Sequence, residues 1–217
     1  MKNLFLALVV SMQLFAGDIE FKGEAKSVKI SGTEVKVFPE AVLKTGDKEL
    51  KVKLTGHATR VKDIPILGKR NVYQIASYMD DLSNVNPEKP LDSLKDTKAR
   101  VLQLTMLMSM TGGQMRGSLE DSLKANEVDI TTTAFKDLFA KFKFSLDAGD
   151  TATIMMFTKE GNVEKVLIEV NNSNPIAFSQ EAKFLGFDLW KAWFGAKFVK
   201  GDDGVKNLQP KLLEIKK

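Results

Sequence analysis

The sequence predicts an α+β protein in which a mainly antiparallel sheet is covered by helices gathered toward the C-terminal half. Three observations lead to this class. The chain has 217 residues, of which 43% are hydrophobic, and this is enough for one globular domain with a sizeable core. Up to about Ser109 the apolar residues alternate with a period of two, which is typical of half-buried strands. From Gly113 onward their spacing becomes helical.

The N-terminal segment has the pattern of a secretory signal peptide. Lys2 supplies a positive charge, residues 4–14 are largely apolar, and Ala16 and Gly17 suit cleavage. A membrane-spanning helix needs about 20 apolar residues, so this run is too short to cross a bilayer. We therefore expect residues 1–16 to be removed and residues 17–217 to form one exported, periplasmic domain. An uncleaved anchor or a buried N-terminal helix is the alternative.

Strands dominate the first half of the chain, where β-branched and aromatic residues occur in period-two alternation. Gly32 with Thr33, and residues 45–47, have the composition of turns between them. The predicted strands are residues 28–30, 34–38, 50–61, 70–79 and 99–110.

Helices and one hairpin make up the second half. Asn174 followed by Pro175 is typical of a helix start, because proline suits the first helical turn, and we expect a helix from there to about Leu185. Residues 159–162 have the composition of a hairpin turn. The strands that this turn joins are residues 151–158 and 163–170. The other predicted helices are one through Leu119, Leu123 and Val128, and residues 133–144, 188–194 and 205–215.

The composition excludes several classes of function. A net charge of +4, spread through sequence of mixed sign, does not indicate a nucleic-acid partner. With no cysteine and one histidine, metal sites built from soft ligands are excluded and zinc sites nearly so. A Ser-His-Asp triad would have to use His57, which the alternation places on a water-exposed face. No metal and no cofactor is expected.

Two polar residues stand where the alternation predicts an apolar face. Arg60 continues the face of Val52 and Ala58, where an unpaired guanidinium would be costly. Tyr73 shares a face with Ile75, and a buried tyrosine hydroxyl needs a partner. In one interpretation the protein supplies the partners itself, a backbone group for the tyrosine and, for the arginine, Asp63, Asp80 or Asp81. In the other, Arg60 binds an anionic ligand, because arginine holds a planar carboxylate through two hydrogen bonds.

The predicted strand at residues 99–110 separates an apolar face from a polar one. Leu102 and Leu104 belong to the apolar face, which fills the core. Gln103, Thr105 and Ser109 belong to the other, which could line a semi-polar cavity.

In order and spacing, four stretches resemble chalcone isomerase-like proteins. Residues 54–60 (LTGHATR) and 71–78 (NVYQIASY) are similar to a strand pair of that family, with its L-x-G-x-x-x-R element. Residues 104–114 (LTMLMSMTGGQ) resemble its strand that ends in a Thr-Gly turn, and residues 184–195 (FLGFDLWKAWFG) resemble a late helix. The resemblance implies an open-faced β-sandwich, with a large antiparallel sheet, a helical layer and a small ligand cleft between them.

Position by position, the resemblance implies binding rather than catalysis. The plant isomerases use an Arg, a Thr, a Lys and a Tyr. Here the Arg is present as Arg60, and the other three positions hold Tyr73, Gln103 and Met115. Met115 has no hydroxyl, so the hydrogen-bond network of the isomerases cannot form. Arg60 with Tyr73 resembles instead the fatty-acid-binding branch of the fold, in which such a pair grips a carboxylate.

We therefore expect a cleft that binds a fatty acid or similar amphipathic carboxylate, with Arg60 and Tyr73 at its head group. The remaining contacts are expected from Gln103, Thr105, Met106, Met108, Met115 and Phe184. The alternative is an isomerase of the intramolecular lyase type acting on a chalcone-like or other enone, in which Arg60 polarises the carbonyl and Tyr73 donates a proton. A third interpretation places residues 178–198, rich in Trp, Phe and Lys, at a membrane interface.

Overall fold

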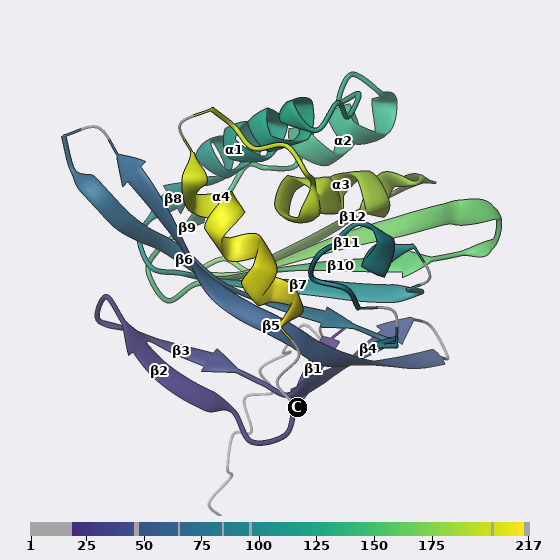
Figure 1. Ribbon diagram of the computed structural model, residues 1–217, viewed down its shortest axis with the longest axis horizontal. Helices are drawn as coiled ribbons and strands as arrows, with labels where there is room; N and C mark the ends of the chain where they lie inside the picture. Colours follow the sequence, from purple (N-terminus) through teal and green to yellow (C-terminus); the bar gives the residue numbers. More distant parts are fainter. Residues whose placement is uncertain are drawn as a thin grey trace, which may run out of the picture.

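An antiparallel sheet of eight strands organises the protein, and its strand order is β1-β4-β5-β6-β7-β10-β11-β12 (Figure 1). The computed structural model describes residues 19–45, 48–64, 66–83, 85–95, 97–200 and 202–214. The predicted signal peptide lies outside these ranges. The strands of the sheet are β1 (Ile19–Lys22), β4 (Glu40–Thr45), β5 (Lys48–Ile64), β6 (Gly68–Met79), β7 (Ala99–Met106), β10 (Thr151–Thr158), β11 (Val163–Asn171) and β12 (Ile176–Lys183).

Helices lie together on one face of this sheet (Figure 1). Thr111 starts the first of them with a capping box, in which its hydroxyl accepts from the Gln114 amide and the Gln114 side chain accepts from the Thr111 amide. Between helices and sheet lies the larger apolar core, which includes Leu104, Leu119 and Trp190. The helices are α1 (Gly112–Ala125), α2 (Thr133–Ala140), α3 (Leu185–Phe194) and α4 (Asp203–Leu208), with 3-10 turns at Asp92–Leu94, Glu160–Asn162 and Gln209–Leu213.

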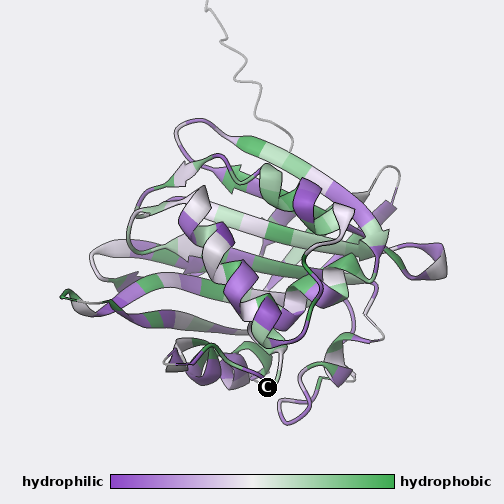
Figure 2. Cartoon of the chain, turned by 90° about the horizontal axis from the view of Figure 1, so that it is seen from above, coloured by the Kyte–Doolittle hydropathy of each residue, from purple (hydrophilic) through white to green (hydrophobic). Residues whose placement is uncertain are grey.

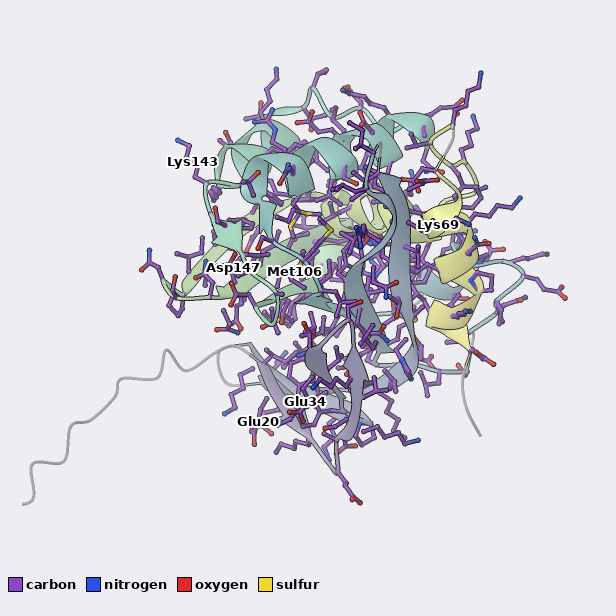
Figure 3. The ribbon with its side chains drawn as sticks, turned by 90° about the vertical axis from the view of Figure 1, so that its left-hand side faces the viewer. Glu20, Glu34, Lys69, Met106, Lys143 and Asp147 are labelled. Carbon is purple, nitrogen blue, oxygen red and sulfur yellow. The ribbon has the colours of Figure 1, made fainter. Side chains whose placement is uncertain are left out.

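The opposite face of the sheet has a smaller core of its own. A hairpin of β2 (Lys26–Ile30) and β3 (Thr33–Val37) lies on this side, where Figure 3 labels Glu34. Val35 and Val37 from the hairpin pack with Tyr78 and Val101 of the sheet. A second small pair, β8 (Met110–Thr111) with β9 (Ser145–Leu146), leads into α1. The α+β class with a large antiparallel sheet and a helical layer is confirmed.

A bulge at Thr55 divides the long strand β5 into two halves. Leu54 pairs with Tyr78 and Gly56 with Ser77, so Thr55 is an extra residue. Because one added residue reverses the faces, Leu54 packs in the smaller core while Ala58 packs under the helices. The single alternation predicted for residues 50–61 is therefore wrong in this detail. Thr55, which a single alternation would place on the water-exposed face of His57, is completely buried, and its hydroxyl lies 2.7 Å from the carbonyl oxygen of Leu212.

One predicted element has the wrong type. Residues 176–183 form β12, an edge strand paired with β11, and not a helix. Asn174 and Pro175 belong to the connection before it, since Asn-Pro is a turn signal as well as a helix start. Ile176 and Phe178 both pack against the larger core, with exposed Ala177 between them, which is the period of a strand. The pattern also missed β1 and β4, and α3 begins at Leu185 rather than residue 188.

Candidate ligand-binding site

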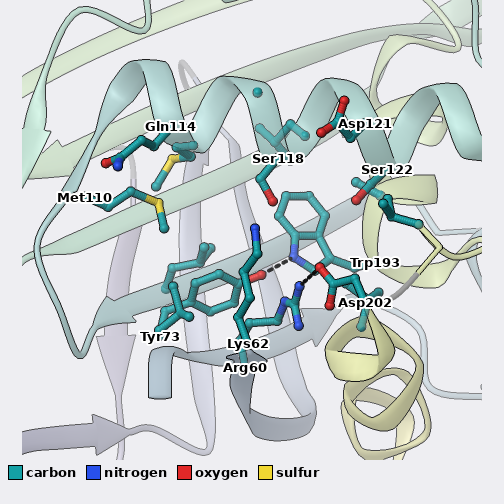
Figure 4. A pocket seen from close by; sticks show the side chains of 18 of the residues that line it. Arg60, Lys62, Tyr73, Met110, Gln114, Ser118, Asp121, Ser122, Trp193 and Asp202 are labelled. Carbon is teal, nitrogen blue, oxygen red and sulfur yellow. Dashed lines mark hydrogen bonds and ion pairs between the residues drawn. The ribbon is translucent and has the colours of Figure 1, made fainter. Parts of the chain in front are cut away.

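A pocket of about 420 Å³ lies between α1 and the strands β5 and β6 (Figure 4). α1 supplies Met115 and Ser118, and α3 supplies Trp193. Residues at the start of the C-terminal segment complete the wall near Asp202. Most of the lining residues are apolar: Ile64, Val72, Leu104, Met108, Met110, Met115, Leu119, Ile154, Ala192, Trp193, Val199 and Val205.

Arg60 lies in the wall of this pocket with its charge already paired. Its side chain is 4% exposed, and its guanidinium forms an ion pair with the carboxylate of Asp202. A second nitrogen donates to the carbonyl oxygen of Val61 at 2.7 Å. The interpretation in which the protein supplies the partner is therefore correct for Arg60. The partner is not Asp63, Asp80 or Asp81 but a residue 142 positions away in the sequence.

Asp202 stands at the N-terminus of α4, and the close approach of this short helix holds the pair together. The Asp202 carboxylate also accepts from the Gly204 amide at 3.1 Å, as an N-cap does. A Cβ at position 204 would overlap the Arg60 guanidinium and the Val61 carbonyl, so only glycine fits there. The residues that begin α4 therefore also enclose Arg60.

Tyr73 lies directly opposite Arg60 on the neighbouring strand, and paired residues of this kind share a face. Its hydroxyl oxygen accepts a hydrogen bond from the indole nitrogen of Trp193 at 3.2 Å, not from the backbone (Figure 4). Desolvation raises the pKa of Tyr73, although the Arg60 charge and the Trp193 bond oppose the rise. Tyr73 thus keeps its proton near neutral pH, and that proton can be donated to a ligand.

Lys62 is a pocket residue that the sequence patterns did not single out. It follows Arg60 by two positions on β5, lines the same pocket and reaches across its front in Figure 4. Within the described ranges Lys62 forms no ion pair. The period-two rule that located Arg60 also places Lys62 on the same face, but a lysine near the end of a predicted strand carries no signal of its own.

The structure brings together only part of the predicted site. Arg60, Tyr73 and Met115 line the pocket, as does Met108. Gln103 and Thr105 do not, because they alternate with Leu102, Leu104 and Met106, which face the helices, and so lie on the opposite face of the sheet. Met106 is buried in the larger core and Phe184 is half exposed, and neither lines the pocket.

His57 is also on the face opposite to the pocket. It pairs across the strands with Ala76, which belongs to the smaller core. Its Nδ1 lies 2.9 Å from the amide nitrogen of Gln74, and the Thr59 hydroxyl donates to the Gln74 oxygen at 2.6 Å. The sheet therefore separates His57 from Arg60 and Tyr73, and His57 does not line this pocket.

The segment considered for a membrane interface is instead docked on the sheet. Trp190, Trp193 and Phe194 are all buried in the larger core. Glu164 of β11 accepts from the amide of Phe187 in the first turn of α3 at 2.7 Å, and its other oxygen pairs with Arg100. Among the described residues, no helix combines the length and the apolar character needed to span a bilayer.

Comparison with known proteins supports the fold. The chain is similar to the crystal structure of a fatty-acid binding protein from Arabidopsis thaliana, with a TM-score of 0.53 and 18% sequence identity, over 86% of this chain and 98% of that one. No protein-family model and no curated protein sequence matches the chain. At this level of identity the likeness concerns the fold and not the ligand. The chain therefore has the open-faced β-sandwich fold of chalcone isomerase type that its sequence predicted.

Proposed function

We propose that the pocket beside Tyr73 binds a fatty acid or a similar amphipathic carboxylate and holds it without chemical change. The observation that carries this proposal is a pocket with a mostly apolar lining, in which the sheet side presents Arg60, Lys62 and the Tyr73 hydroxyl. The other polar side chains come mainly from α1: Gln114, Ser118, Asp121 and Ser122. Its volume of about 420 Å³ is within the range of small-molecule sites, about 300–1,000 Å³. The fatty-acid binding protein with the same fold gives independent support.

The apolar walls would supply most of the affinity. Each buried methylene contributes about 0.8 kcal/mol, so a chain of ten contributes more than any single polar contact, which is worth about 1.5–3 kcal/mol when charged. Met108, Met110 and Met115 suit this role, because their flexible thioethers adapt to chains of different length. Arg60, Lys62 and Tyr73 would then orient the ligand.

The head group would first meet Tyr73 and Lys62. Both can act without rearrangement, since Tyr73 retains a proton to donate and Lys62 forms no ion pair within the described ranges. Arg60 is neutralised by Asp202, and it would add a charge-assisted bond only if the Asp202 carboxylate gave way. This ranking differs from the expectation that Arg60 and Tyr73 act as an equal pair.

Filling the pocket from α1 tests the proposal. Gly117 lines the pocket, and nothing lies within 4 Å of the Cβ that a substitution there would add. Gly117→Leu should therefore extend into the pocket and block it, while the better helix propensity maintains stability. Gly113→Leu is the matched control, because Gly113 is exposed on the same helix and does not line the pocket.

The measurements are native mass spectrometry with organic extraction and titration with laurate. We expect acyl ligand and laurate binding in the wild type and in Gly113→Leu, and at least a tenfold weaker affinity in Gly117→Leu. Equal laurate affinity in the two leucine variants, or no binding by the wild type, would refute the proposal. If the wild type converts chalcone and Tyr73→Phe does not, the isomerase alternative is correct and the binding proposal is not.

A further inference from the structure

The β5–β6 hairpin projects beyond the sheet as a two-stranded arm (Figure 1). β7 pairs with β6 only from Tyr73 onward, and β4 pairs with β5 only up to Lys53. Val61 to Ile64 and Gly68 to Asn71 are therefore paired with each other and with no further strand of the sheet. At the base of the arm, the Asn71 side chain donates to Ser31 of the β2–β3 hairpin at 3.0 Å.

The tip of the arm is apolar, and its conformation is costly. Ile66 is fully exposed and Leu67 is 55% exposed. Ile66 has φ +73°, a left-handed conformation that β-branched residues rarely adopt, and the turn is closed by a bond from the Leu67 amide to the Ile64 carbonyl at 3.1 Å. Neither the exposure nor the backbone conformation stabilises the free protein. Such an outlier points to a role outside folding.

Basic residues surround this tip. Lys62, Lys69 and Arg70 are exposed, and the arm itself carries one carboxylate, that of Asp63. Lys62 pairs across the strands with Arg70, and Asp63 with Lys69, so cations occupy both faces of the arm. Within the described ranges none of the three cations forms an ion pair. Figure 2 shows the apolar tip at the left, and Figure 3 shows Lys69 on the arm facing the viewer.

We infer that the tip of the β5–β6 arm is a docking site for an anionic membrane surface, with Ile66 and Leu67 inserted at the level of the head groups. Apolar side chains within a basic collar match such a surface in both chemistry and charge. A protein partner is less favoured, because among the described residues Val61 is the one other exposed large hydrophobic residue of the arm, and it is only 38% exposed. Docking does not depend on the proposed ligand, but it would place the pocket at the bilayer, since Lys62 and Ile64 belong to both the arm and the pocket wall.

Vesicle co-sedimentation with the full chain tests this inference. The tip variant is Ile66→Asn with Leu67→Ser, because asparagine tolerates the left-handed conformation and both changes remove apolar surface. Phe184→Asn is the matched control, since Phe184 is also half exposed and left-handed, with φ +57°, but lies before α3. All three proteins share the same N-terminal segment, so any difference between them is due to the substituted site.

With vesicles of phosphatidylcholine containing about one quarter phosphatidylglycerol, we expect the tip variant to bind at least about fivefold more weakly than wild type and Phe184→Asn to bind equally. The double change Lys69→Glu with Arg70→Glu should weaken binding to these anionic vesicles more than it weakens binding to vesicles of pure phosphatidylcholine. Thermal unfolding should show that the tip variant is at least as stable as wild type, because strain at position 66 is relieved.

Equal vesicle binding by the tip variant and wild type would overturn the inference. So would a wild-type dimer, seen by sedimentation velocity without vesicles, that the tip variant converts to monomer, because a second copy would then be the occupant of the tip. Neither result concerns laurate binding, so failure here and failure of the proposed function can be distinguished.

Discussion

Arg60 and Asp202 are the residues on which the chemistry of the pocket depends. A buried guanidinium needs a counter-charge, and here the chain itself provides one from the start of α4. The Arg60–Asp202 pair is therefore close to neutral, and among the described lining residues Lys62 is the cation that remains for an incoming anion. A ligand that reaches Arg60 has to compete with Asp202.

Replacing Asp202 by Asn separates its role as the cap of α4 from its role as the counter-charge of Arg60. Asparagine can still cap α4, but it leaves Arg60 without a counter-charge, so the free energy of unfolding should fall by about 2–4 kcal/mol in denaturant titrations. Laurate should in turn bind roughly tenfold more tightly by calorimetry, because Arg60 becomes available to its carboxylate. Asp137→Asn, a change in an exposed carboxylate of α2 that does not line the pocket, is the control and should alter neither value strongly. Unchanged laurate affinity in Asp202→Asn would show that Arg60 does not contact the ligand.

The docking of α3 on the sheet depends on a second buried arginine that the sequence patterns did not identify. Arg100 donates to Glu164 at 3.0 Å and lies over the Trp190 ring, with its charged carbon 5.5 Å from the ring centre. Burial lowers the pKa of Arg100 to about 10, although Glu164 opposes the change. Glu164 thus connects β7 with the first turn of α3, the helix that carries Trp193 to Tyr73.

Loss of Glu164 should loosen this attachment. Glu164→Ala leaves the Arg100 charge buried without its partner, and we expect a loss of about 3–5 kcal/mol in the free energy of unfolding. Glu181→Ala breaks an exposed pair with Lys159 and should cost less than about 1 kcal/mol. The double change Arg100→Met with Glu164→Leu should recover most of the stability, since apolar residues often replace a buried pair without loss. Similar losses of stability in Glu164→Ala and Glu181→Ala would contradict a special role for Glu164 in holding α3 on the sheet.

The whole molecule has two apolar layers on one sheet, and each contains one of the two tyrosines. Tyr73 packs against the core under the helices, and Tyr78 belongs to the core under the β2–β3 hairpin. Burial raises the pKa of Tyr73 and that of Tyr78, against the opposing effects of Arg60 and Trp193 on Tyr73. Each hydroxyl therefore ionises at a higher pH than that of an exposed tyrosine.

An alkaline titration should report this directly. The unfolded chain releases its tyrosine protons near pH 10, whereas the folded protein retains them, so stability falls as the pH rises above about 10. We expect tyrosinate absorbance to appear in one cooperative step together with the loss of far-ultraviolet circular dichroism. Tyr73→Phe should halve the absorbance change. Tyrosinate formation near pH 10 with intact circular dichroism would mean that one hydroxyl is open to water.

Much of the fold follows from local patterns. Residues 70–79, 151–158 and 163–170 are strands as predicted, because their alternation and composition are local properties. The same alternation located Arg60 on a buried face and Tyr73 beside it. Export through residues 1–16 stays a prediction, since that segment lies outside the described ranges.

The tertiary structure decided which polar groups meet. The Thr55 bulge reverses a face of β5, and it lies beside the C-terminal segment, whose backbone would overlap any side chain at Gly56. Asp202 reaches Arg60 from 142 residues away, and no periodicity predicts contacts at that distance. Gln103 and Thr105 lie outside the pocket because the helices cover only the other face. Alternation along a strand separates two faces, but packing against the rest of the chain determines which of them is covered and by what.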